Sequence, residues 1–305
     1  MRVYFEKFKE SFLLITITLI VFESCREEVT TEFEDFLATP VVNSILIADS
    51  TINVHVSMTG KVNASQLEIV ENADILLFVN GHLMDSVIYK GEGIYFTKTV
   101  VAPGKTYSCE VSIPGFPLVR CSDSISTPVA VSVISYKSIA GRDEEGISYS
   151  SVTFTFFDDP LQRNFYEAKI RLLIDNSSRY SEIINISDPL LLNEGLPMAV
   201  FSDELIDNGS YTMTLNFYND SYGYGDSTGY YEVPYPFQIE LRNLSFNFYQ
   251  YVKQLYLYES GRYPDIVGGV VTPFQLHSNV ENGYGIFAGY STAFSDTIFS
   301  EPVKK

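Results

Sequence analysis

Residues 52–58, INVHVSM, alternate between apolar and polar side chains without interruption. Ile52, Val54, Val56 and Met58 would lie on one face of a strand, and the polar residues between them on the other. Because successive side chains of a strand point to opposite faces of a sheet, we predict a strand that is buried on one side. This pattern decides the fold class, since similar segments recur along the chain.

The segments that follow in the chain carry strand and turn signals. Residues 73–89, ADILLFVNGHLMDSVIY, predict two strands joined at Asn80-Gly81, a dipeptide typical of tight hairpins. Residues 93–113 add two more strands, with Pro103-Gly104 between them. Short strands at this spacing predict a β-sandwich over residues 39–127, of either an immunoglobulin-like or a carboxypeptidase-regulatory-like type.

The second half of the chain shows the same alternation. Apolar residues recur at every second position in YTMTLNFY (211–218) and FQIELRNL (237–244), among other segments. GRDEEG, residues 141–146, is predicted to be an exposed acidic loop just after the boundary between the two halves. We therefore expect residues 128–305 to form a second β-rich domain.

One prominent helix is predicted near residues 245–259. Ser245 can cap it, and Gly261 can end it. Its apolar positions recur at helical spacing and predict a face that packs on the core. They are Phe248, Tyr251, Val252, Leu255 and Tyr258. The whole chain is therefore expected to be mainly β, with a sandwich followed by a β-rich region that carries this helix.

Composition agrees with a folded, strand-rich chain and limits its partners. Hydrophobic residues make up 46% of the sequence, and the 22 Tyr and 22 Phe favour strands. The formal net charge of −18 argues against a nucleic-acid partner, because phosphate binding needs clustered Lys and Arg.

The N-terminus has the pattern of a secretory signal, predicted over residues 1–24. Basic residues precede a short apolar run from Phe12 to Phe22, too short to span a bilayer comfortably. A buried N-terminal strand or helix is the alternative. Cys25 then follows Ser24 in a position that resembles the lipobox of bacterial lipoproteins, where the cysteine carries a diacylglycerol and an acyl chain. Two or three such chains would anchor the protein stably, and we expect no other cofactor.

The residues after Cys25 indicate a destination. CREEV resembles the export signal that sends lipoproteins of Bacteroidota to the outer face of the outer membrane, with the periplasmic leaflet as the alternative. Residues 25–38 are mainly acidic and polar, and we expect them to be a tether between the anchor and the folded body.

The other two cysteines lie symmetrically about Gly115. A hairpin centred there would place Cys109 opposite Cys121, and a non-hydrogen-bonded pair would bring them close enough for a disulfide. A pair of buried free thiols is the alternative. No Cys-x-x-Cys motif is present, so a catalytic dithiol is not expected.

The sequence carries no recognised catalytic motif. His55, His82 and His277 are widely separated, without metal-ligand spacing, and each is expected to be an ordinary structural or surface residue. Asp158-Asp159-Pro160 could hold calcium, but it lacks an EF-hand pattern and is better explained as a solvated turn. We therefore expect no catalytic residues and no metal.

Residues 218–236, YNDSYGYGDSTGYYEVPYP, suggest a long loop that contacts a ligand or partner. Tyrosine supplies rigid contact area, and Ser, Gly and Asn supply adaptable hydrogen bonds. A mobile surface excursion is the alternative. The tyrosines are Tyr218, Tyr222, Tyr224, Tyr230, Tyr231 and Tyr235.

The chain resembles a known family over nearly the whole length expected after cleavage. Blocks such as VENADILLFVNG, FDDPLQRNFYEAKI, FSDELIDNGSYTMTLNF and NLSFNFYQYVKQLYLYES occur in order, and SNVENGYGIFAGYS (278–291) is the most specific. They are similar to the Bacteroidota lipoproteins grouped as domain of unknown function 4249. The family has no established activity. Its members are commonly encoded beside TonB-dependent outer-membrane receptors, which implies a role in uptake. We predict that the last block is a hairpin of residues 272–280 and 285–294, turning at Asn282-Gly283.

Together these patterns predict a non-enzymatic, lipid-anchored outer-membrane protein that binds substrate for, or docks on, a TonB-dependent receptor. A surface hydrolase of glycan or peptide and a structural or adhesive surface protein are the alternatives. The sequence does not identify the ligand.

Overall fold

We describe a computed structural model of the chain, which covers residues 37–61, 66–84, 87–175, 177–207, 209–227, 229–261 and 275–304. The described residues from Ala38 onward form one compact unit. The predicted signal peptide, Cys25 and nearly all of the predicted tether lie outside the described residues.

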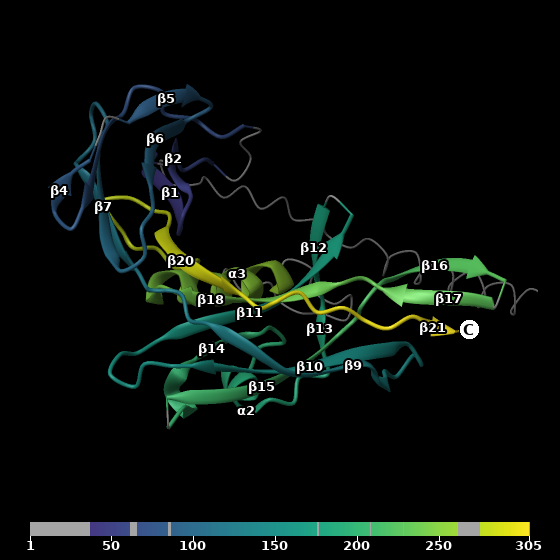
Figure 1. Ribbon diagram of the computed structural model, residues 1–305. Coiled ribbons are helices and arrows are strands. Elements are labelled where there is room, and N and C mark those ends of the chain that lie inside the picture. Colours follow the sequence, from purple (N-terminus) through teal and green to yellow (C-terminus); the bar gives the residue numbers. More distant parts are fainter. Residues whose placement is uncertain are drawn as a thin grey trace, which may run out of the picture. The chain divides into compact units, whose positions relative to one another are not determined.

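The described chain is mainly β, as predicted, and its largest sheet has nine strands. Its order is β12-β11-β18-β20-β1-β2-β6-β5, with β14 beside β11 (Figure 1). The strands are β1 (Pro40–Ile47), β2 (Thr51–Met58), β5 (Ile88–Gly91), β6 (Ile94–Val100), β11 (Phe165–Ile174), β12 (Ser177–Ser181), β14 (Val200–Ser202), β18 (Phe237–Leu244) and β20 (Phe287–Phe294).

A five-stranded sheet faces one part of this large sheet, in the order β19-β8-β7-β3-β4. Its strands are β3 (Asp74–Val79), β4 (His82–Leu83), β7 (Lys105–Ser112), β8 (Val119–Ile125) and β19 (Val280–Glu281). Ile52, Val54 and Val56 of β2 are fully buried, in one apolar core with Leu77 of β3 and Val111 of β7. The alternation in INVHVSM thus buries the predicted face, and the N-terminal strands form a sandwich.

The turns of this sandwich follow the local sequence. Asn80 and Gly81 have φ of 48° and 78°, and they join β3 to β4. Gly104 has φ of 72° before β7, and Gly115 has φ of 87° between β7 and β8. These residue types tolerate positive φ, so the chain turns where the sequence predicts. The strand predicted after Gly81 is divided, because β4 pairs with β3 whereas β5 joins the large sheet.

A second sandwich is built by the other part of the large sheet and a four-stranded sheet in the order β13-β15-β10-β9. Phe237, Ile239 and Leu241 of β18 are fully buried in one core with Met213 and Leu215 of β15, as the alternation predicts. The strands of this sheet are β9 (Val131–Arg142), β10 (Ser148–Phe157), β13 (Ile183–Ile184) and β15 (Ser210–Phe217).

The short helices α2 (Pro189–Glu194) and η1 (Asp203–Leu205) flank β14, and the long helix α3 (Phe246–Gly261) follows β18. Oγ of Ser245 accepts a hydrogen bond from the Phe248 amide at 3.1 Å, which confirms the predicted cap. Phe248 and Tyr249 are buried in a third apolar cluster with Tyr290 of β20, whereas Tyr258 is exposed. The first half of the helix therefore packs on the core, whereas the end of the predicted apolar stripe is exposed.

The predicted C-terminal hairpin is wrong. Residues 275–279, the described part of the predicted first strand before β19, form no strand; β19 pairs with β8, and β20 pairs in parallel with β1 and antiparallel with β18. Asn282 does turn the chain, with φ of 58°. A Cβ on Gly285 would overlap the carbonyl oxygen of Val42, and a Cβ on Gly289 would overlap that of Leu46. The two glycines therefore allow this segment to approach β1 closely.

The parallel pairing of β1 with β20 joins segments on either side of the boundary expected between residues 127 and 128. Ser44 pairs with Phe287, and Ile47 pairs with Tyr290. Asn279 strengthens this junction, because its side chain donates to the Ser122 carbonyl at 3.1 Å and binds both backbone polar groups of Phe287. The large sheet thus takes strands from both predicted domains.

The predicted tyrosine-rich loop is a β-hairpin instead. β16 (Ser221–Asp226) pairs antiparallel with β17 (Gly229–Pro234), and β21 (Val303–Lys304) adds a third strand. Tyr222 and Tyr224 alternate along β16, as suits a pleated strand, and the loop interpretation overlooked this signal.

Candidate functional site

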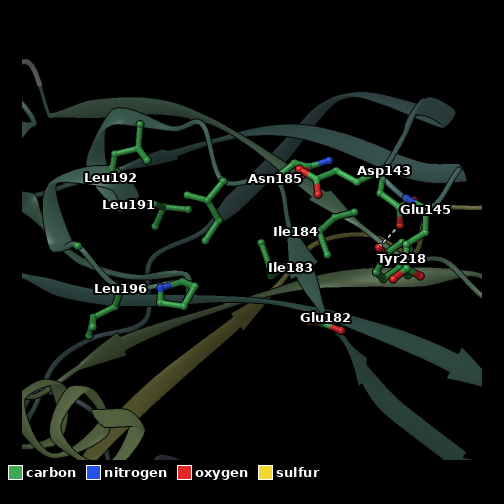
Figure 2. Close-up of a pocket in the computed structure, with 14 residues that line it drawn as sticks. Asp143, Glu145, Glu182, Ile183, Ile184, Asn185, Leu191, Leu192, Leu196 and Tyr218 are labelled. Atoms are coloured by element: carbon green, nitrogen blue, oxygen red, sulfur yellow. Dashed lines mark hydrogen bonds between the residues drawn. The ribbon is translucent and has the colours of Figure 1, made fainter. Parts of the chain in front are cut away.

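An open pocket lies in the second half of the chain, with a volume of about 760 Å³. Ligand sites typically enclose about 300–1,000 Å³, so this pocket could hold a small molecule or a short peptide. Four separate segments line it: the β9–β10 turn, β13 and its flanks, α2 with the residues after it, and Tyr218. Figure 2 shows the leucines of α2 at one end and Asp143, Glu145 and Tyr218 at the other.

The apolar end is shaped by the two caps of α2. Asp188 Oδ1 accepts the Leu190 amide at 3.0 Å at the start of the helix, and Gly195 ends it with φ of 69°. This short turn buries Leu191 in the core, but Leu192 remains 58% exposed beside the pocket. Leu196 and Pro197 continue the apolar wall. Apolar surface left exposed in a concavity is typical of a binding site.

The acidic end is organised by Asp143. Its Oδ1 accepts the amides of Glu145 and Ile147 at 3.0 and 2.8 Å, and its Oδ2 accepts the hydroxyl of Tyr218. The Tyr218 hydroxyl is the main cause that holds the pKa of Asp143 below its usual range, assisted by the backbone amides. Asp143 therefore remains ionised at neutral pH and fixes the turn that carries Glu144 and Glu145.

The other carboxylates of the pocket are exposed and make no ion pair with a described residue. They belong to Glu144, Glu145 and Glu182. The hydrogen bond to Asp143, burial and the charges of Asp143, Glu182 and Glu145 raise the pKa of Tyr218 to about 12. Three carboxylates thus act on one hydroxyl, and no Lys or Arg is among the residues that line the pocket.

The structure separates the six predicted contact tyrosines. Tyr218 lies in the pocket, whereas the others belong to the β16–β17 hairpin or its end. Tyr224 stacks on its cross-strand partner Tyr231 at 5.4 Å between ring centroids, and Tyr222 contacts Tyr235 at 5.5 Å. The ring of Tyr230 covers Gly223 on the other face. The hairpin therefore presents a row of four tyrosine rings along one side.

Cys109 and Cys121 are opposed, as predicted, but both thiols are free and buried. The Asn80 amide donates to the Thr106 carbonyl, so the backbone of Thr106 faces β3, and by alternation that of Cys109 faces β8. The two cysteines are therefore a hydrogen-bonded pair, not the closer kind that we expected. In a hydrogen-bonded pair the two Cβ atoms typically lie about 5.5 Å apart, whereas a disulfide needs a Cβ–Cβ distance of roughly 3.5–4.5 Å. The contact with Cys109 and burial raise the pKa of the Cys121 thiol.

The three histidines and the acidic turn at Asp158 lie in different parts of the fold. His55 is on β2, His82 is on β4, and His277 Nε2 contacts Asn247 Oδ1 at 3.0 Å. The prediction of a solvated turn is wrong for Asp158, which is buried and accepts the hydroxyl of Tyr166 at 2.6 Å. Within the described ranges, no group of three His, Cys, Asp or Glu side chains could hold a metal ion.

No local pattern in the sequence indicates the buried ionic network on β11 and β18. Arg242 binds Glu167 at 2.9 Å and Glu240 at 2.6 Å, and Tyr180 donates to Glu240 at 2.8 Å. The register that pairs Glu167 with Arg242 creates it. Because one guanidinium engages both carboxylates, they are held as ion-pair partners.

Across the part of the chain that the structure describes, no helix is long and apolar enough to cross a membrane. No curated protein matches the chain. A family described as "Domain of unknown function (DUF4249)" matches residues 26–295. This match spans most of the chain, including the pocket and the junction of β1 with β20. The chain belongs to the DUF4249 family.

Proposed function

We propose that this protein is a non-enzymatic, lipid-anchored lipoprotein of the outer membrane that binds a ligand for a TonB-dependent uptake system. The open pocket between α2 and the β9–β10 turn is the observation that carries the binding role. It combines exposed apolar surface with a few fixed polar groups, the usual make-up of a ligand site. Cys25 is the attachment point of the lipid in this proposal, and the surface leaflet is favoured over the periplasmic one.

Support for the uptake role comes from the sequence. The chain has a lipobox-like segment before Cys25 and the CREEV segment at the cysteine. The resemblance to DUF4249 lipoproteins further implies a neighbouring TonB-dependent receptor. The tyrosine row of the β16–β17 hairpin, in which Tyr222 and Tyr224 are exposed, is a second contact surface. It suits a protein partner because tyrosine gives rigid contact area at small entropic cost.

The carboxylates of Glu167, Glu240 and Asp143 are poor candidates for the acid and base of a hydrolase, because other groups of the protein engage them. A glycan hydrolase needs an acid and a base or nucleophile whose carboxyl groups stand about 5–9.5 Å apart and are free to exchange protons. The buried Glu167 and Glu240 are both engaged by Arg242. In the pocket, Asp143 is engaged by Tyr218 and two amides.

The test is a mild-detergent pull-down of the full chain from membranes, with Cys25→Ala as the matched form without an anchor. We expect the wild-type chain in the outer membrane, with a TonB-dependent receptor in stoichiometric amount. The Cys25→Ala chain should leave the membrane fraction. A wild-type chain found in the cytoplasm would overturn the anchor, and a chain purified alone would overturn the transporter role.

A further inference from the structure

The two ends of the pocket differ in chemistry, and this difference specifies a ligand. Leu191, Leu192 and Leu196 lie at one end, whereas Asp143, Glu145 and Tyr218 lie at the other (Figure 2). Ile183 and Ile184 lie between them. A ligand that fills such a pocket needs an apolar body and a polar head at opposite ends, because burying either group against the wrong end costs free energy.

The charges that line the pocket favour a cationic head, although Arg142 on the same turn binds the Gly146 carbonyl. Four carboxylates line the pocket, and the lining includes no Lys or Arg that could neutralise them. Asp143 already accepts three hydrogen bonds from the protein, which leaves Glu144, Glu145 and Glu182 as the groups available to a ligand. An anion at this end would meet only like charge, whereas an ammonium or guanidinium group would be attracted.

The acidic end is fixed by the fold and does not depend on a flexible side chain alone. The amides of Glu145 and Ile147 bind Asp143 Oδ1, so the turn keeps one conformation. Tyr218 attaches that turn to the end of β15, and the Ser181 hydroxyl binds the Tyr218 carbonyl beside Glu182. The backbone segments that carry these carboxylates are therefore held together before any ligand arrives, which lowers the entropic cost of binding.

We propose that this pocket binds an organic cation, with its ammonium or guanidinium group among Glu144, Glu145 and Glu182 and its apolar body against the leucines of α2. The proposal rests on the proposed function, because it takes this pocket as the ligand site. Two sources present the same group: a free hydrophobic amine, or a peptide with a basic residue beside aliphatic ones.

Calorimetry on the full chain in nonionic detergent tests this chemistry. The probes are hexylammonium, the peptide acetyl-Arg-Leu-Leu-amide, and its acidic counterpart acetyl-Glu-Leu-Leu-amide. We expect the two cationic probes to bind, more weakly at high salt because exposed charges are screened, and the acidic peptide not to bind. Binding of one cationic probe alone would still support the proposal and would identify the source.

The matched variants separate the pocket from overall charge. The pocket variant combines Glu144→Gln, Glu145→Gln and Glu182→Gln. It should weaken cation binding at least about five-fold, because it removes a few exposed ion pairs. The control combines Glu68→Gln, Glu259→Gln and Glu301→Gln, which change the net charge equally at exposed positions outside the pocket. Equal affinity in the two triple variants would overturn the proposal, as would binding of the acidic peptide or of none of the probes.

The apolar half has its own variant. Leu192→Asn should reduce the preference for acetyl-Arg-Leu-Leu-amide over acetyl-Arg-Gly-Gly-amide, and Leu161→Asn, at an exposed site outside the pocket, should not. An unchanged preference in Leu192→Asn would contradict the assigned orientation. Receptor co-purification is measured separately, so a cation bound without a receptor would overturn only the uptake role. A receptor bound without cation affinity would overturn only this inference.

Discussion

The hydroxyl of Tyr218 donates a hydrogen bond to Oδ2 of Asp143, and this bond joins two segments that lie 75 residues apart in the sequence. It attaches the end of β15 to the turn between β9 and β10. The acidic end of the pocket exists because of this bond, since Asp143 also organises the turn that carries Glu144 and Glu145.

Removing that hydroxyl should change the titration of Asp143. In Tyr218→Phe, we expect the pKa of Asp143 to rise toward its usual range, because the hydroxyl is the main cause of its low value. A carboxyl group whose pKa is lowered by folding stabilises the fold above its usual pKa, and this contribution is lost as pH falls through the lowered value. Carboxyl NMR titration measures the shift. Tyr224→Phe is the control, and equal Asp143 pKa values in both variants would contradict the assignment.

A side chain at Gly289 should severely weaken the fold. The Cβ of Gly289→Ala would overlap the Leu46 carbonyl oxygen, where β20 runs beside β1. We expect a loss of at least about 2 kcal/mol in the free energy of unfolding, measured by urea denaturation, because the backbone must shift. Gly225→Ala is the control, since its Cβ would meet nothing closer than 3.9 Å. Similar midpoints for the two variants would disprove the close approach.

The ion pair between Lys253 and Glu194 should hold α3 against α2. The two groups are 2.6 Å apart, with side chains only 22% and 5% exposed. Burial alone would raise the pKa of Glu194, but hydrogen bonds from Lys253 and Tyr249 outweigh it and lower the pKa. Lys253→Met removes one hydrogen-bond donor and the cation from a buried carboxylate that Tyr249 still binds, and should cost roughly 1–3 kcal/mol at pH 7.

This loss should depend on pH in a defined direction. The stabilisation in the wild type is present above the usual pKa of a glutamate and disappears as pH falls through the lowered pKa of Glu194. Urea midpoints of wild type and Lys253→Met should therefore converge in acid. Lys98→Met, at an exposed site, should follow the wild type at every pH, and a constant gap for Lys253→Met would count against the ion pair.

The two buried cysteines should remain reduced. We expect alkylation after unfolding without reductant to label both Cys109 and Cys121, and mass spectrometry to find the tryptic peptides 106–120 and 121–137 separately. In the folded protein the same reagent should react slowly, because both side chains are at least 95% buried. A linked pair of peptides would show that the hydrogen-bonded register relaxes enough to form the disulfide.

Several local features could be predicted from the sequence by itself, although the C-terminal hairpin and the tyrosine-rich loop were not among them. Period-two alternation identified the buried faces of β2, β15 and β18, because side chains of a strand alternate between its two sides. Asn80-Gly81 fixed a hairpin through its tolerance of positive φ, and Ser245 fixed the start of α3 through its side-chain oxygen. Each of these signals acts within a few residues, so one segment is enough to recognise it.

The tertiary structure alone decided which distant segments meet. The parallel pairing of β1 with β20, the register that sets Glu167 beside Arg242, and the four segments around the pocket have no local signature. GRDEEG was recognised as an exposed acidic loop, but its meeting with Tyr218 and the leucines of α2 depends on strand order. Strand order reflects the burial of whole sheet faces, a property of the entire chain that no short segment encodes.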